Sequence, residues 1–118
     1  MEIFDIGIIG MGVVGGTTAK VLSKIHKIHA YDKYKKEYQD IPGLINSEVV
    51  FICVPTPMKK SGEIDYSAIH NSLDFLSELA EKYKKYPLVI IRSTAVSGTT
   101  DNWLNSILSL NLSLTQNS

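Results

Sequence analysis

Residues 6–15, IGIIGMGVVG, decide the fold of this chain. The apolar first part predicts a buried β-strand, and Gly10 stands where such a strand has to turn sharply. Gly12 leaves the backbone bare, and Gly15 allows the next element to approach the strand closely. We therefore expect a strand, a tight turn and then a helix over roughly residues 13–24.

A second signal lies about twenty residues further on, where Asp32 closes another short apolar run. A glycine turn, a helix N-terminus and a carboxylate in this register are typical of a dinucleotide site, because helix N–H groups attract phosphates and the carboxylate accepts hydrogen bonds from the adenosine ribose. The alternative is a glycine-rich turn without a ligand. The carboxylate favours NAD over NADP, since it repels a 2′-phosphate. Three lysines follow the carboxylate, and either they lie in a solvated turn or one of them neutralises such a phosphate. They are Lys33, Lys35 and Lys36.

Apolar and helical segments alternate along the chain, which predicts an α/β domain with a doubly wound, Rossmann-like parallel sheet. The predicted strands cover residues 3–9, 28–31, 49–54 and 88–92. Only sixteen residues separate Asp32 from Val49, so this connection is abbreviated, with a turn of helix at 35–39 before Pro42-Gly43 leads into the next strand. An amphipathic helix is expected over 66–83, with Asp65 as its N-cap.

Two further loops follow apolar strands and should lie at the carboxyl edge of the sheet, where open α/β sheets bind ligands. The first contains Val54-Pro55-Thr56-Pro57, whose prolines stop sheet pairing and hold the loop extended. The second is 93–100, STAVSGTT. Either loop alone is equally well explained as a plain exit loop. Their convergence with the glycine turn predicts a shared pocket.

Composition limits the classes of function. A length of 118 residues and a net charge of +0 indicate one domain without an electrostatic footprint for nucleic acid or an anionic membrane. No apolar run reaches the ~20 residues of a membrane span. The single cysteine, Cys53, excludes an internal disulfide and predicts a cytoplasmic protein.

The domain is expected over 1–101, and 102–118 holds no charged residue. We expect this tail to be a short helix or disordered, and to drive formation of a homo-oligomer. The residues expected to be buried in that assembly are Trp103, Leu104, Ile107 and Leu108.

The histidines lack metal-ligand spacing, so no metal site is predicted, and they are expected to be surface or hydrogen-bonded residues. They are His26, His29 and His70. Three tyrosines near the second strand are expected to pack around it, with adenine contact as the alternative for the first two. They are Tyr31, Tyr34 and Tyr38.

Three segments, GMGVVG at 10–15, VFICVPTP at 50–57 and STAVSGTT, together resemble the N-terminal, NAD-binding domain of the UDP-glucose/GDP-mannose dehydrogenase family over about residues 6–100. The junction at 65–67 is also similar. The resemblance implies that the glycine turn holds the pyrophosphate, Asp32 the adenosine ribose, the loop after the third strand the adenosine side, and Ser93 and Thr94 the nicotinamide side. The implied cofactor-binding residues are Gly10, Met11, Gly12, Val13, Val14, Gly15, Asp32, Lys33, Val54, Pro55, Thr56, Ser93 and Thr94.

Members of this family oxidise the C6 alcohol of a nucleotide sugar to a carboxylate through two NAD-dependent hydride transfers and a cysteine nucleophile in a later domain. The resemblance implies that Thr94 lies near the reaction centre and helps to order a catalytic water, although residues 95–97 replace the family's usual proline-rich turn. Cys53 falls within a predicted strand and is expected to be a core residue. We therefore expect an NAD-binding half whose substrate domain and nucleophile lie outside this chain. The alternative is a stand-alone NAD-binding or interaction module.

Overall fold

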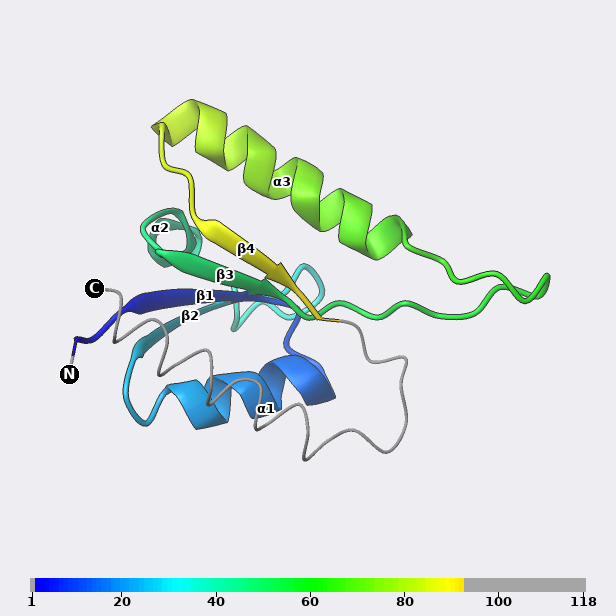
Figure 1. The fold of residues 1–118 in the computed structure, drawn as a ribbon, viewed down its shortest axis with the longest axis horizontal. Helices are drawn as coiled ribbons and strands as arrows, with labels where there is room; N and C mark the ends of the chain where they lie inside the picture. Colours follow the sequence, from blue (N-terminus) through cyan, green and yellow to red (C-terminus); the bar gives the residue numbers. More distant parts are fainter. Residues whose placement is uncertain (1, 93–118) are drawn as a thin grey trace.

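Four parallel strands in the order β2-β1-β3-β4 form the sheet of the computed structural model, which describes residues 2–92. The elements are β1 (Asp5–Ile9), α1 (Val13–Leu22), β2 (Lys27–Tyr31), α2 (Ile41–Ile45), β3 (Val49–Ile52), α3 (Ser67–Tyr83) and β4 (Leu88–Ile91). Figure 1 shows α1 on one face of the sheet and α2 and α3 on the other. The predicted α/β class with a doubly wound parallel sheet is confirmed.

The two faces of the sheet have separate cores because side chains alternate along each strand. Ile6, Ile8 and Phe51 pack with Leu22 on the face that α1 covers. On the other face, Ile9 and the even-numbered residues of β3 pack with Leu44 and Leu76 from α2 and α3. β1 and β3 are therefore buried on both sides, as their apolar sequences predict.

The strand order changes direction at β1. β1 lies between β2 and β3, so the chain passes to one side of β1 through α1 and then crosses to the other side through α2. Ile9 pairs with Tyr31 and with Ile52, which brings the three exit loops together. Ligands of open α/β sheets bind at such a change of strand order.

The four predicted strands and the predicted helices at 13–24 and 66–83 are found, but most of their ends differ. The outer residues of the predicted strands at 3–9, 49–54 and 88–92 are extended or looped, whereas β2 begins one residue earlier than predicted, at Lys27. Helix α1 ends at Leu22 and not at residue 24, because the chain turns there to bring Lys27 N–H to the carbonyl of Phe4. Cys53 is the first residue after β3, so its predicted place within a strand is wrong.

The predicted helical turn at 35–39 is also wrong. This segment turns back on the end of β2: Asp32 N–H donates to the Tyr38 carbonyl, and Gln39 forms an antiparallel bridge with Tyr31. The helix, α2, begins instead at Ile41 and contains Pro42-Gly43. Asp40 caps it by accepting a hydrogen bond from Gly43 N–H at 3.0 Å, and proline fits the first turn because its missing N–H has no partner there.

Three smaller predictions have mixed outcomes. The N-cap of α3 is Tyr66 and not Asp65, although the Asp65 carboxylate accepts a hydrogen bond from Ser67 N–H at 2.9 Å, which lowers the pKa of Asp65. Tyr31 packs as expected, stacked on Phe75 with ring centroids 4.8 Å apart. Tyr34 does not, because its side chain is 87% exposed.

The predictions for Ser93, Thr94 and the tail at 102–118 lie outside the described residues. Within residues 2–92, no helix is long and apolar enough to cross a membrane.

Candidate functional site

The glycine turn between β1 and α1 is held against β3 by two glycines that tolerate no side chain. Gly10 has a φ of +94°, and a Cβ there would lie 2.7 Å from the Cys53 carbonyl oxygen. A Cβ on Gly15 would collide with the carbonyl oxygen of Gly10. Gly10 N–H donates to the Tyr31 carbonyl at 2.8 Å, which continues the pairing of β1 and β2 into the turn. The turn thus has one fixed position at the carboxyl edge.

Gly12 is different, because the space beside it is open. A Cβ on Gly12 would meet no heavy atom within 4 Å, and the residue has an ordinary φ of −80° as the N-cap of α1. No side chain caps this helix, and Val13 is 86% exposed, whereas Val14 packs on the α1-side core. The first N–H groups of α1 and the positive end of its dipole therefore stand beside open space.

Asp32 ties the end of β2 to the glycine turn. Its Oδ2 accepts a hydrogen bond from Met11 N–H at 2.8 Å, and its Oδ1 accepts one from Tyr34 N–H at 2.9 Å. The Lys35 ammonium donates to the Met11 carbonyl, also at 2.8 Å. Lys33 is exposed, with its ammonium 5.7 Å from the Tyr34 ring centroid. A carboxylate and a cation thus both contact the backbone of Met11.

The loop after β3 contributes a buried hydroxyl to the same edge. Thr56 is only 8% exposed, and its Oγ1 has no hydrogen-bond partner within the part of the chain that the structure describes. Val54 packs on the α3-side core, and Pro55 is exposed. A buried hydroxyl without a partner costs free energy, so an external donor or acceptor at this position would stabilise it.

Cys53 is a core residue, as predicted. It is 4% exposed and packs with Ile8 and Phe51 on the α1 side. Burial raises the pKa of its thiol to about 11, even though a hydrogen bond with Thr18 lowers it. A thiol that stays protonated in a core is not poised as a nucleophile.

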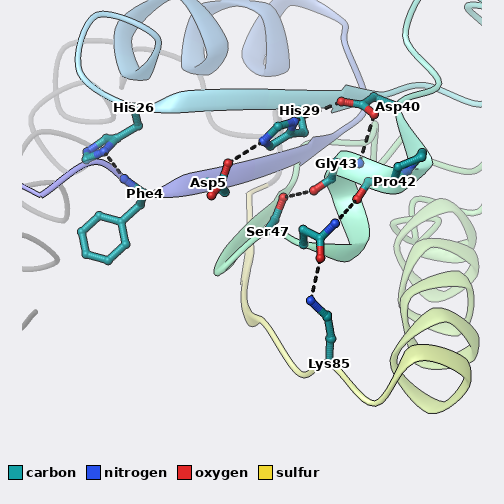
Figure 2. A network of polar contacts seen from close by, with 10 residues as sticks. Phe4, Asp5, His26, His29, Asp40, Pro42, Gly43, Ser47 and Lys85 are labelled. Atoms are coloured by element: carbon teal, nitrogen blue, oxygen red, sulfur yellow. Dashed lines mark hydrogen bonds and ion pairs between the residues drawn. The ribbon is translucent and has the colours of Figure 1, made fainter.

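The prediction that His26 and His29 are hydrogen-bonded is confirmed, and Figure 2 shows both contacts. His26 is buried, and its Nδ1 accepts a hydrogen bond from Phe4 N–H at 3.0 Å. His29 lies between two carboxylates, with Nε2 2.8 Å from Asp5 Oδ1 and Nδ1 3.0 Å from Asp40 Oδ2. We name the contacts of His29 with Asp5 and Asp40 the His29 bridge. Among the described residues, no group of three or more His, Cys, Asp or Glu could hold a metal ion.

The arrangement suits a ligand with phosphates and a ribose. The uncapped helix and open Gly12 fit an anion without steric cost, and the Asp32 carboxylate lies next to them to accept hydroxyl groups. The loop after β3 contains the buried Thr56 hydroxyl, which has no hydrogen-bond partner among the described residues. The bonds of the Met11 backbone to Asp32 and Lys35 were not predicted from the sequence.

Comparison with known proteins supports the family resemblance of the sequence. A model of the UDP-glucose/GDP-mannose dehydrogenase family, NAD binding domain, matches residues 32–117. The chain is 34% identical over 59 residues to a GDP-mannose 6-dehydrogenase of Pseudomonas aeruginosa. The aligned region covers 50% of this chain and 14% of the relative. It is 37% identical over 62 residues to a UDP-glucose 6-dehydrogenase of Rickettsia bellii, covering 52% of this chain and 14% of that protein. The chain therefore matches only a small part of these relatives.

Two solved structures share the fold. One is a ternary complex of GDP-mannose dehydrogenase from Pseudomonas aeruginosa, with a TM-score of 0.65, 20% identity, and coverage of 88% of this chain and 31% of that one. The other is a UDP-glucose dehydrogenase from Pyrobaculum islandicum, with a TM-score of 0.64, 16% identity, and coverage of 92% and 33%. The family match begins at residue 32, so it does not include the glycine turn.

Proposed function

Because the chain belongs to the UDP-glucose/GDP-mannose dehydrogenase family and falls in its NAD binding domain, we propose that the glycine turn, Asp32 and Thr56 together hold NAD for the oxidation of a nucleotide sugar. When bound, NAD would accept the hydride. The residues of this chain bind and orient it at the edge where β1, β2 and β3 end. In this proposal the sugar binds outside the described residues, and the remaining catalytic groups also lie outside them.

The observation that carries this proposal is the open space at Gly12. The neighbouring glycines, Gly10 and Gly15, are explained by contacts within the chain, because a Cβ on either would strike backbone atoms. Gly12 has no such explanation, since neither its φ nor its surroundings exclude a side chain. A pyrophosphate close to the backbone N–H groups of α1 supplies the missing reason.

Asp32 has the capacity to bind the adenosine ribose without losing its internal contacts. Each carboxylate oxygen accepts one backbone N–H, from Met11 or Tyr34, and keeps a further lone pair for a ribose hydroxyl. A 2′-phosphate would meet the same negative charge, so the site prefers NAD to NADP. Lys33 lies beside this position and remains a proposed contact.

The loops after β3 and β4 complete the proposed site. Val54, Pro55 and Thr56 lie on the adenosine and ribose side, where the Thr56 hydroxyl would gain the partner that it lacks. Ser93 and Thr94 follow the end of β4 by two and three residues and are assigned to the nicotinamide side by the family resemblance. Thr94 is proposed to help order a catalytic water there.

Calorimetric titration with NAD and NADP tests the proposal. We expect the chain to bind NAD at least about tenfold more tightly than NADP, and Asp32→Asn to weaken NAD binding and reduce this preference, because an amide has one acceptor oxygen and no charge. Glu37→Gln is the matched control: it removes one negative charge at an exposed position of the same segment and should leave both affinities unchanged. Equal binding of both cofactors by the unaltered chain would refute the assignment.

A further inference from the structure

Lys35 and Asp32 bind the two backbone polar groups of Met11. Its ammonium donates to the Met11 carbonyl at 2.8 Å, while Asp32 Oδ2 accepts from Met11 N–H at the same distance. Both groups come from the short segment after β2, although Lys35 and Met11 are 24 residues apart in the sequence. The two polar atoms of one residue are thus fixed by one neighbouring loop.

This loop has hydrogen bonds of its own. The Asp32 carboxylate accepts from Tyr34 N–H at 2.9 Å, and Lys35 N–H donates to the Asp32 carbonyl at 3.2 Å. The backbone of Asp32 also donates to Tyr38. Asp32 and Lys35 are thus joined by hydrogen bonds within one short loop, and they present an anion and a cation to the glycine turn.

The carbonyl of Met11 determines the direction of the next N–H group. A trans peptide is planar, so the C=O of Met11 and the N–H of Gly12 point in opposite directions. A bond that fixes the Met11 carbonyl toward Lys35 therefore directs the Gly12 N–H away from Lys35. Gly12 is the N-cap of α1 and stands beside the open space described above.

We propose that Lys35 is a positioning residue that sets the orientation of the Met11–Gly12 peptide before the cofactor binds. The proposal rests on the proposed NAD site. Lys35 acts through the Met11 carbonyl and keeps the Gly12 N–H in the orientation that the pyrophosphate requires. Without this contact the peptide is free to rotate, and the cofactor must select the productive orientation from several, which lowers its affinity.

The test compares Lys35→Met, Lys35→Arg and Lys36→Met in the full chain. Lys35→Met should weaken NAD binding about three- to tenfold, the effect of one lost hydrogen bond. It should also shift the amide NMR signals of Met11 and Gly12 and speed their hydrogen exchange in the absence of NAD. Lys35→Arg should restore both properties, because a guanidinium also donates to a carbonyl. Lys36→Met removes the same charge from the adjacent exposed residue and should change neither.

The outcomes separate this proposal from the proposed function. If Lys35→Met weakens NAD binding but leaves the free-state signals of Met11 and Gly12 unchanged, Lys35 contacts the cofactor directly and the positioning role is wrong. Unchanged affinity and unchanged signals would overturn it as well. If the unaltered chain fails to bind NAD, the proposed function fails, and the amide signals of Lys35→Met alone decide whether Lys35 orients the peptide.

Discussion

In both the glycine turn after β1 and the first turn of α2, a glycine lies close in space to an aspartate. The space beside the glycine is open in the first turn and filled in the second. A Cβ on Gly12 would meet no atom within 4 Å, whereas a Cβ on Gly43 would collide with the Asp40 carboxylate and the His29 ring. The α2 turn is thus filled by contacts within the chain. The difference shows that spacing alone does not identify a ligand site. Open space supports one at Gly12 because this glycine is also the N-cap of a helix without a side-chain cap and lies beside the Asp32 carboxylate.

The two aspartates differ in the same way. Asp40 caps α2 through Gly43 N–H and also contacts His29, so its carboxylate serves the fold. Asp32 accepts from Met11 and Tyr34 at the edge where the strand order changes, beside an uncapped helix. Both carboxylates accept backbone N–H groups, but only Asp32 stands at the proposed ligand position.

The largest expected effect is that of Gly15→Ala. Its Cβ would collide with the Gly10 carbonyl oxygen, a backbone atom that cannot rotate away, so we expect a loss of about 3 kcal/mol in the free energy of unfolding. Urea denaturation followed by circular dichroism measures this. Gly16→Ala is the control one position later, where a Cβ meets nothing within 4 Å, and it should stabilise the chain by about 0.5 to 1 kcal/mol. An unchanged midpoint for Gly15→Ala would show that the turn is not packed as described.

Gly43→Ala should have a smaller effect. The atoms that its Cβ meets belong to the side chains of Asp40 and His29, which can rotate toward solvent at the expense of the His29 bridge. We expect a loss of about 1 to 2 kcal/mol in the same denaturation experiment. Gly12→Ala, in the open turn, should unfold at the midpoint of the unaltered chain. Equal losses for the two variants would remove the distinction between an open and a closed turn.

The smallest effect concerns the pH dependence of the His29 bridge. Burial lowers the pKa of His29, but hydrogen bonds and charges from Asp5 and Asp40 outweigh it, so the pKa is raised above 6.5. The backbone hydrogen bond from Gly43 and the contact with His29 lower the pKa of Asp40 below 3.8. Because the pKa of His29 is raised, its bridge contributes fully to the free energy of unfolding below pH 6.5, and this contribution is lost as the pH rises through the raised pKa. Because the pKa of Asp40 is lowered, its contribution is present above pH 3.8 and is lost as the pH falls through the lowered pKa.

The bridge should therefore contribute most at mildly acidic pH. Because both carboxylates are more than a third exposed, we expect less than about 1 kcal/mol. Unfolding free energies at about pH 5.5 and about pH 8.5 should differ more for the unaltered chain than for His29→Gln. His70→Gln, at an exposed histidine, is the control and should behave as the unaltered chain. An identical pH profile for His29→Gln would contradict the bridge.

The sequence predicts what depends on local spacing. The three glycines of the turn, the apolar strands and the period of α3 follow from residues close together in the chain, and all are found. The position of α2 was missed because Pro42-Gly43 is typical of a turn, while the cap from Asp40 makes it the start of a helix.

Contacts between distant residues could not be predicted in this way. His29 and Asp5 are 24 residues apart, as are Lys35 and Met11, and their contacts exist only because β1 and β2 are adjacent. The unpartnered hydroxyl of Thr56 likewise depends on how the loop after β3 is buried. The sequence proposes the candidate site residues, but the contacts among those that the structure describes follow only from the fold.

The central claim is that NAD occupies the open space beside Gly12. Calorimetric titration of Gly12→Val and Gly16→Val with NAD tests this claim most directly. Neither new side chain would meet an atom of the protein at its Cβ, so both variants should fold, as circular dichroism will check. We predict that Gly12→Val loses at least about tenfold in NAD affinity, whereas Gly16→Val binds NAD as the unaltered chain does. A folded Gly12→Val variant that binds NAD with unchanged affinity would contradict the account.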